Sequence, residues 1–200
     1  MQRRYRAIAI SAWGLCFASL LFAPFIAQPA MGGTCIAPDR LQIDAVSKHF
    51  SQERYLSGVD NPLKSEGELK LTKDRITWHM TAPFDVETVI TPQGITQSVD
   101  GGPAEPTGDV AGLGPKIATL FANLLQGRWS ELDSVFNVSK KPVAEGEPWA
   151  VSLQTIDPKL QEAIGQIDIE GCSDISRIKI YHKNGDYELI RFDMGSASTP

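Results

Sequence analysis

Three histidines are the residues best suited to acid–base chemistry in this chain of 200 residues, and they lie far apart, at His49, His79 and His182. A general base needs a reacting group within hydrogen-bond reach, and no HExxH, GxSxG, P-loop or GxGxxG motif supplies one. Asp168 and Glu170 alternate on one segment, which is more typical of a solvated strand face than of an acid pair or a calcium site. We therefore predict a protein that is not an enzyme, with no catalytic residues, no metal and no cofactor.

The cysteines indicate an oxidising compartment. Cys16 lies in an apolar N-terminal segment, which leaves Cys35 and Cys172 as a pair in the rest of the chain. Cysteines in even number in an exported protein favour a disulfide, so we predict a bridge between Cys35 and Cys172. Two unrelated thiols are the alternative. No CxxC pair and no Cys/His spacing suggests a metal site.

The first 32 residues are typical of a secretory signal peptide. Arg3, Arg4 and Arg6 come first, residues 7–27 then carry no charge, and small residues follow as far as Gly32. This order of a basic head, an apolar stretch and a small-residue exit predicts cleavage after Gly32. Residues 33–200 are then expected to form a single domain. An uncleaved membrane anchor is the alternative, because the apolar stretch is long enough to cross a bilayer.

The charge of the remaining chain excludes two classes of partner. The whole chain has a net charge of −5, and its first 32 residues contribute three arginines and no acid, so residues 33–200 carry −8. A strongly acidic domain without a basic cluster is unsuited to nucleic acid or to an anionic membrane surface.

The hydrophobic pattern of residues 33–200 predicts an α+β fold that is mainly β. A helix is expected over residues 41–50, where Leu41, Ala45 and Val46 can share one face. Alternating or β-branched runs then predict strands at 68–71, 75–80, 86–91, 94–99, 149–153, 166–170, 175–182 and 186–192. A Gly/Pro-rich loop covers 100–114, helices are expected within 113–136, and a short helix spans 159–164. No βαβ rhythm occurs, so one curved antiparallel sheet capped by helices on one face fits best.

The chain contains more large apolar residues than the core of a small sheet requires. In the predicted strands they lie on the face that is expected to contact the helices. They can fill a core or line a cavity, and the pattern alone does not decide between the two. The candidate cavity and lid residues are Ile76, Trp78, Met80, Leu113, Ile117, Leu120, Phe121, Leu124 and Trp149.

Several short motifs, in order and spacing, resemble the periplasmic outer-membrane lipoprotein carrier LolA and its relatives, over about residues 40–193. In the first half these are Phe50-Ser51-Gln52, Gly67-Glu68-Leu69 and Trp78-His79-Met80-Thr81-Ala82-Pro83. The second half resembles a shorter branch of the same superfamily, through Phe121-x-x-Leu124-Leu125-x-Gly127-x-Trp129, Trp149-x-Val151-x-Leu153, Ile167-x-Ile169-x-Gly171 and Gly185-Asp186.

The resemblance implies an unclosed β-barrel capped by helices, whose hydrophobic cavity shelters acyl chains crossing the periplasm. It implies a monomeric carrier or chaperone whose partners are an acylated lipoprotein or lipid cargo, an inner-membrane releasing complex or exporter, and an outer-membrane acceptor. An accessory role in export of a lipidic or aryl-polyene product is an alternative, and an enzyme acting on envelope lipids is a weaker one. The segment 113–136 would act as a lid, with the 100–114 loop as its hinge.

The sequence departs from the lipoprotein carriers in one segment that matters for cargo transfer. The carriers have a basic residue between the Gly-x-Leu strand and the Trp, and here that segment is one residue shorter. Lys73 or Arg75 can stand in for it. The pair Cys35 and Cys172 is also not part of the family's core pattern.

The signal peptide leads to the first testable prediction. When the full chain is expressed with its own N-terminus in a bacterium, the intact mass of the product should correspond to a chain that begins near Gly33. The product should be recovered in the soluble periplasmic fraction. A product that keeps Arg3, Arg4 and Arg6 and sediments with the inner membrane would instead establish the anchor.

Overall fold

The fold is seen in a computed structural model of the chain, which describes residues 35–41, 46–72, 75–107 and 114–193. All of these residues belong to one compact unit, Gly33–Pro200. The expected signal peptide, Leu113 and Lys73 lie outside the described residues. None of the helices formed by the described residues is long and apolar enough to cross a membrane.

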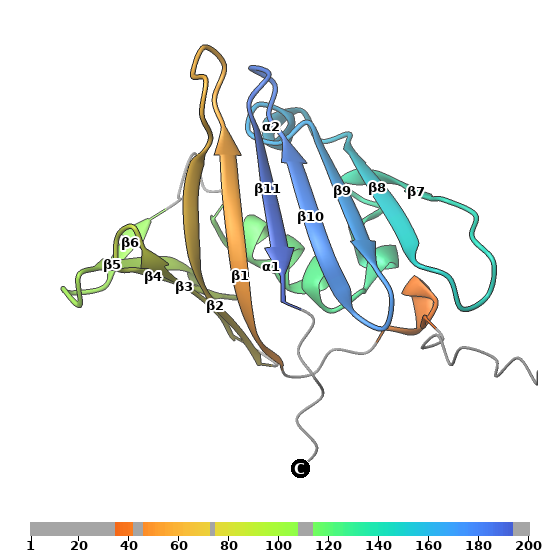
Figure 1. The fold of residues 1–200 in the computed structure, drawn as a ribbon, viewed down its shortest axis with the longest axis horizontal. Helices are drawn as coiled ribbons and strands as arrows, with labels where there is room; N and C mark the ends of the chain where they lie inside the picture. The colour runs from red at the N-terminus through yellow and green to blue at the C-terminus, as the bar shows by residue number, and fades with distance from the viewer. Residues whose placement is uncertain (1–34, 42–45, 73–74, 108–113, 194–200) are drawn as a thin grey trace, which may run out of the picture. The chain divides into compact units, whose positions relative to one another are not determined.

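In the part of the chain that the structure describes, eleven strands form one antiparallel sheet, in the order β6-β5-β4-β3-β2-β1-β11-β10-β9-β8-β7. The order consists of two meanders, β1–β6 and β7–β11, that meet where β1 pairs with β11. The two end strands, β6 and β7, do not pair with each other, so the sheet is curved but unclosed (Figure 1). The bounds are β1 Val46–Tyr55, β2 Leu63–Thr72, β3 Arg75–Ala82, β4 Val86–Thr91, β5 Gly94–Val99, β6 Glu105–Thr107, β7 Phe136–Lys140, β8 Trp149–Thr155, β9 Gln166–Gly171, β10 Ile175–Tyr181 and β11 Tyr187–Phe192.

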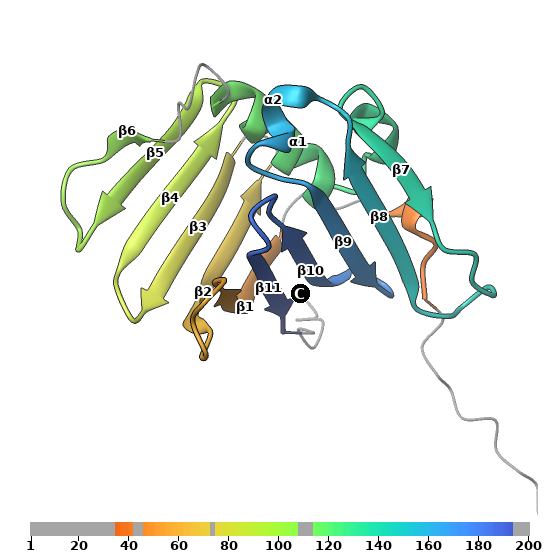
Figure 2. The ribbon, with the colours of Figure 1, turned by 90° about the horizontal axis from the view of Figure 1, so that it is seen from above.

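Helices lie on the concave side of this sheet (Figure 2). Helix α1 spans Gly114–Leu125 and is followed by the 3-10 helix η3 at Trp129–Leu132, while α2 at Pro158–Gln161 connects β8 to β9. Asp157 caps α2, because its carboxylate accepts hydrogen bonds from the backbone N–H groups of Lys159 and Leu160. A third short helix, η1 at Pro38–Arg40, precedes β1. The expected architecture, a mainly β fold with one curved antiparallel sheet capped by helices, is confirmed.

A β-bulge bends the sheet where β2 meets β3. The register shifts between Glu66 and Gly67, so that Gly67 pairs with Met80 while Glu66 pairs with Ala82. A Cβ at Gly67 would lie 2.0 Å from the backbone oxygen of His79, so only glycine permits this close approach. The bulge increases the local twist and helps to curve β2 and β3 around the concave side.

The predicted helix over residues 41–50 is wrong at its second half, because Val46–Tyr55 is strand β1. Pairing on both sides, with β2 and β11, satisfies its backbone and outweighs the local helical spacing of Leu41, Ala45 and Val46. The 100–114 segment is also not all loop, because Glu105–Thr107 pairs with β5 as the edge strand β6.

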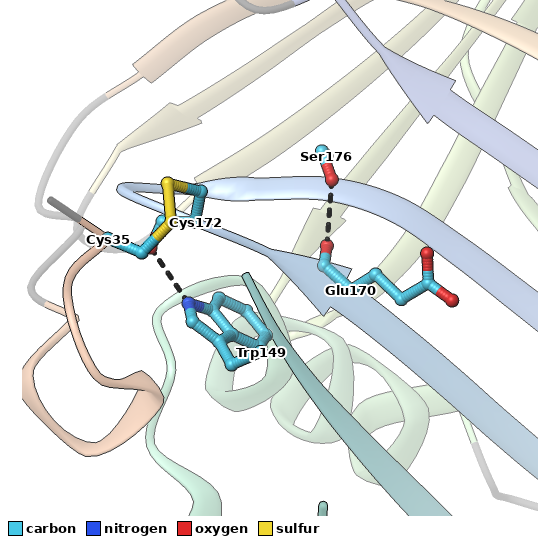
Figure 3. Close-up of a disulfide and its surroundings, with 5 residues drawn as sticks. All are labelled: Cys35, Trp149, Glu170, Cys172 and Ser176. Carbon is cyan, nitrogen blue, oxygen red and sulfur yellow. Dashed lines mark hydrogen bonds between the residues drawn. A yellow bond between two sulfur atoms is a disulfide. The ribbon is translucent and has the colours of Figure 1, made fainter. Parts of the chain in front are cut away.

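The expected disulfide is present between Cys35 and Cys172, which are 137 residues apart (Figure 3). Backbone bonds secure the same corner: Cys35 N–H donates to Gly146 and Ile36 N–H donates to Cys172. The indole of Trp149 also donates to the carbonyl of Cys172 at 2.8 Å. The disulfide therefore attaches the segment before β1 to the β9–β10 connection.

Removing this bridge should destabilise the domain without changing its fold. In the chain-entropy description a closed loop of this length constrains the unfolded state strongly, so we expect Cys172→Ser to lower the free energy of unfolding by about 2–5 kcal/mol. Denaturant titration of the oxidised protein and the variant measures the difference. The double variant Cys35→Ser/Cys172→Ser is the control and should lose no more than the single one. Two reactive thiols in the denatured, unreduced mature protein would contradict the bridge.

Candidate functional site

The concave face of the sheet is filled along part of its length and hollow at one end. In the filled part Leu69, Leu71 and Ile76 are only 1–2% exposed, and Leu124 and Leu125 of α1 are buried in the same core. At the hollow end of strands β1–β5 lies a cavity of about 410 Å³. The residues that line it are Gln52, Arg54, Leu63, Lys64, Ser65, Trp78, Met80, Pro83, Phe84, Val86, Thr88 and Gln97.

Strand register explains why side chains from distant parts of the sequence meet in this cavity. Trp78 and Met80 follow Ile76 at intervals of two along β3, so all three side chains face the concave side. Thr88 lies opposite Trp78, and Val86 lies opposite Met80, on β4. Gln97 of β5 lies opposite Thr88. The cavity floor is therefore a continuous patch across three neighbouring strands.

Trp78 marks the boundary between the core and the cavity. Its ring centroid lies 4.1 Å from that of Phe50 and 6.3 Å, edge-on, from that of Phe192. The indole is half-buried, packs against the buried core and lines the cavity with its other surface. Aromatic contacts on one side fix the ring, so the apolar surface that it presents to the cavity is pre-formed.

The other end of the concave face is closed by a charged pair. Lys48 of β1 forms an ion pair with Asp174 and donates a hydrogen bond to the carbonyl of Ile175 at 3.0 Å. Its ammonium also lies 5.6 Å from the ring centroid of Phe192. Lys48 is mostly buried, and a buried charge is tolerated because it is paired and hydrogen-bonded. This pair closes the space between β1 and the turn before β10.

The polar residues of the cavity wall are mostly engaged with one another. Gln97 donates from its amide to the hydroxyl of Thr88 at 3.2 Å. Gln52 donates from its amide to Glu188 at 2.7 Å, and its amide oxygen accepts from Ser65 at 3.4 Å. These bonds leave the apolar side chains of Trp78 and Met80 as the principal contact surface for a ligand. The wall therefore suits an apolar ligand in contact with a few polar groups.

The mouth of the cavity carries exposed apolar side chains. Phe84, in the turn between β3 and β4, is 67% exposed, and Leu63 at the start of β2 is 56% exposed. Both also line the cavity. Exposed apolar residues gathered at the rim of a cavity mark a site of interaction more strongly than scattered ones do.

A second and more polar cavity of about 520 Å³ shares Arg54 with the first. Its other lining residues come from the α2–β9 and β10–β11 connections: Glu162, Ala163, Ile164, His182, Lys183, Asn184 and Asp186. The backbone N–H of Ser57 donates to the Asp186 carboxylate at 2.8 Å, and this bond lowers the pKa of Asp186. Asp186 therefore remains an anion that fixes the β10–β11 turn against the β1–β2 turn.

The structure places the candidate cavity and lid residues in different environments. Trp78 and Met80 line the cavity, whereas Ile76, Leu124 and Trp149 are 2–3% exposed and belong to the filled core. Leu120 is half-buried and packs against that core. Leu113 and the side chains of Ile117 and Phe121 lie outside the described residues. The large apolar residues of the concave face thus fill a core in one part of that face and line a cavity in another.

Trp149 is a residue of β8 and does not line the cavity over β1–β5. Its indole N–H donates to the carbonyl of Cys172 (Figure 3). Its ring lies against Gly171, where a Cβ would be 2.3 Å from the ring. Trp129 contacts it edge-on with centroids 6.1 Å apart. Trp149 supports the disulfide corner rather than a ligand.

The segment 113–136, expected to act as a lid, is anchored at its second half. Leu124, Leu125 and Trp129 are 3–4% exposed and Leu132 is fully buried. The indole of Trp129 donates to the carbonyl of Pro38 at 2.8 Å. Burial of this degree makes the end of α1 and η3 a part of the core.

The transfer cation was expected at Lys73 or Arg75, and the described basic residues that line the cavity are Arg54 and Lys64. Lys73 lies outside the described residues, and Arg75 is exposed at the start of β3, about 17 Å of strand away from Met80. The other cavity residues that the sequence did not predict are Gln52, Leu63, Ser65, Pro83, Phe84, Val86, Thr88 and Gln97. The spacing Phe50–Gln52–Arg54 would have indicated Arg54, had residues 50–54 been interpreted as a strand.

Two of the three histidines, His79 and His182, and the acids considered for catalysis have structural partners. Nε2 of His79 lies 2.9 Å from Asp85, while His182 contacts the carbonyl of Ala163 and the carboxylate of Glu188. Asp168 accepts from Ser152 and Gln166, and Glu170 pairs with Arg177. Within the described ranges no group of three metal-ligating side chains occurs.

Comparison with known proteins yields structural likeness only. No family model matches the chain, and no curated protein matches it in sequence. The structure is similar to that of a LolA superfamily protein from Nitrosomonas europaea, with a TM-score of 0.41, 6% identity, and coverage of 78% of this chain and 88% of that chain. It is also similar to a DUF1329 family protein from Desulfovibrio piger, with a TM-score of 0.31, 8% identity, and coverage of 82% and 89%. With scores and identities this low, neither likeness carries an argument about function.

The division of the concave face into core and cavity predicts unequal effects of truncation. Leu124→Ala should lower the free energy of unfolding by about 2–5 kcal/mol, because it opens a hole in a packed core. Met80→Ala should lower it by about 1 kcal/mol or less, because the side chain already borders an open space. Denaturant melts of both variants make the comparison, and equal losses would show that Met80 belongs to the core.

Proposed function

We propose that the protein is a periplasmic carrier that shelters an acyl chain of a lipid or lipoprotein in the cavity over β1–β5, for transfer towards the outer membrane. The observation that supports it most directly is the cavity itself. A pre-formed space of about 410 Å³, lined by Trp78, Met80, Val86 and Leu63, offers apolar surface that the core does not use. Its volume lies within the range of ligand-binding sites, roughly 300–1,000 Å³.

The chemistry of the cavity favours carriage over catalysis. Transfer of each methylene from water to apolar surroundings contributes about 0.8 kcal/mol, which is sufficient for an acyl chain to enter without any covalent step. A hydrolase would need a nucleophile beside a base, yet the described contacts of His182 are to Ala163 and Glu188. His182, which lines the neighbouring polar cavity, is therefore held as part of that wall.

The sequence supports the location and the partners. A basic, apolar and then small-residue N-terminus is that of an exported chain, and a disulfide suits an oxidising compartment. The motif resemblance to lipoprotein carriers adds an inner-membrane releasing complex or exporter and an outer-membrane acceptor as partners of a monomeric protein. A lipidic product of an envelope exporter is the second candidate cargo, and the same cavity would serve it.

Placing a charge in the cavity wall should abolish ligand binding while the protein stays folded. Met80→Asp puts a carboxylate where an acyl chain would lie, and we expect at least a tenfold loss of affinity for a fluorescent fatty-acid probe, because the buried chain then faces an unpaired charge. Fluorescence titration of the wild-type protein and the variant measures the effect. A cooperative thermal melt and an unchanged circular-dichroism spectrum establish that the variant is folded.

Thr81→Asp is the matched control. Thr81 is the next residue of the same strand, is exposed and does not line the cavity. The control adds the same charge to the protein and should bind the probe as the wild type does. Full probe binding by a folded Met80→Asp variant would exclude this cavity as the binding site.

A further inference from the structure

Arg54 is the lining residue that the apolar and the polar cavity have in common. It follows Phe50 and Gln52 at intervals of two along β1, and half of its side chain, 52%, is exposed. A guanidinium at the junction of an apolar and a polar cavity lies where it can contact the head group of an amphiphile. The acyl chain of that amphiphile would then lie in the apolar cavity.

The nearest carboxylate, that of Glu188, forms an ion pair with this guanidinium that is too long to be a hydrogen bond. One oxygen of Glu188, Oε2, accepts a hydrogen bond from Gln52 at 2.7 Å. The other, Oε1, lies 3.2 Å from Nε2 of His182 and 3.6 Å from Nε of Arg54, beyond hydrogen-bond distance for the arginine. Glu188 is thus held by two neighbours, and the described residues give the two terminal nitrogens of Arg54 no hydrogen bond.

Those terminal nitrogens are the part of arginine that recognises anions. A guanidinium presents its donors as a planar fork, which matches the oxygens of a carboxylate or a phosphate in a bidentate contact. The neighbouring wall of the polar cavity includes two acids, Glu162 and Asp186. The acids of that wall are already engaged in part, because Asp186 accepts from Ser57 and from Asn184.

The size of the apolar cavity also limits the number of acyl chains that it can hold. Its volume of about 410 Å³ lies near the lower end of the range for ligand sites. The concave face beyond it is occupied by Leu69, Leu71 and Ile76, which are 1–2% exposed. This space suits one chain better than the several chains of a multiply acylated cargo.

We infer that the preferred ligand is a single-chain amphiphile with an anionic head group, whose chain lies against Trp78 and Met80 and whose carboxylate or phosphate is bound by Arg54. This inference rests on the proposed function, since it names the ligand class of the same cavity. It adds a specificity-determining residue that neither the sequence motifs nor the structural likenesses indicate.

The test compares amphiphiles with the same chain and different heads. Palmitate, hexadecanol and 1-palmitoyl lysophosphatidic acid are titrated by displacement of the fluorescent fatty-acid probe at pH 8 and low salt. The wild type should bind palmitate or the lysophosphatidic acid at least tenfold more tightly than hexadecanol, because a hydrogen-bonded charge pair is lost with the neutral head. Whichever anion binds more tightly identifies a carboxylate or a phosphate as the natural head group.

Arg54→Gln should remove most of this preference. We expect about a tenfold or larger loss of affinity for the anionic ligands and less than a twofold change for hexadecanol. Arg54→Lys, which keeps the charge but not the planar fork, should fall between the two. Lys183→Gln is the matched control, because Lys183 lines the polar cavity alone, and it should change the affinity for palmitate by less than twofold.

The outcomes separate this inference from the proposed function. Equal binding of palmitate, the lysophosphatidic acid and hexadecanol by the wild type, or an equal loss for all three in a folded Arg54→Gln variant, would overturn the role of Arg54. The carrier proposal would survive both results, provided that Met80→Asp still abolishes binding. Failure of all three amphiphiles to bind the wild type would overturn both.

Discussion

The pairing of the first strand with the last is the interaction on which the rest of the fold depends. Strands β1–β6 and β7–β11 are two separate meanders, and the ladder from Phe50↔Phe192 to Tyr55↔Tyr187 joins them into one sheet. The same register brings Phe50 and Phe192 against Trp78 on the concave side and stacks Tyr55 on Tyr187 on the other. The core and the cavity both lie on the surface that this pairing creates.

A sheet that stays open must protect its two edges, because unpaired strand edges can pair with other chains. Edge strand β6 is only three residues long and contains Pro106, which cannot donate to a further strand. At the end of β7, Lys140 forms an ion pair with Asp39. In the β7–β8 connection, Gly146 forms an isolated antiparallel β-bridge with the backbone of Cys35. The disulfide holds this N-terminal segment in place, so it also protects an edge of the sheet.

The sequence predicted the sheet better than the site, and β1 shows the reason. Between residues 48 and 54 of β1, the positions that face the concave side are Lys48, Phe50, Gln52 and Arg54. Only Phe50 among these four is apolar, so this part of the strand shows no hydrophobic alternation. Lys48 closes one end of the face and Arg54 lies at the cavity, and these tertiary roles require polar residues. Along β3, alternation predicted that Ile76, Trp78 and Met80 lie on one face, as they do. Alternation does not predict which part of that face a helix covers. Leu125 of α1 lies beside Leu69 and Leu71, whereas Met80 lines the cavity, and this division of one face depends on the whole fold.

For the carrier proposed above, the balance between holding and releasing an acyl chain follows from the same geometry. Full burial of a 16-carbon chain would contribute roughly 12 kcal/mol before ordering costs, which is too much for a ligand that must be released. At the cavity mouth, however, Phe84 is 67% and Leu63 is 56% exposed, so part of a bound chain would remain in contact with water. Arg54 is half-exposed, and a charge pair in contact with water contributes far less than a buried one. Release therefore needs no large movement of α1, whose C-terminal end is fixed in the core by Leu124 and Leu125.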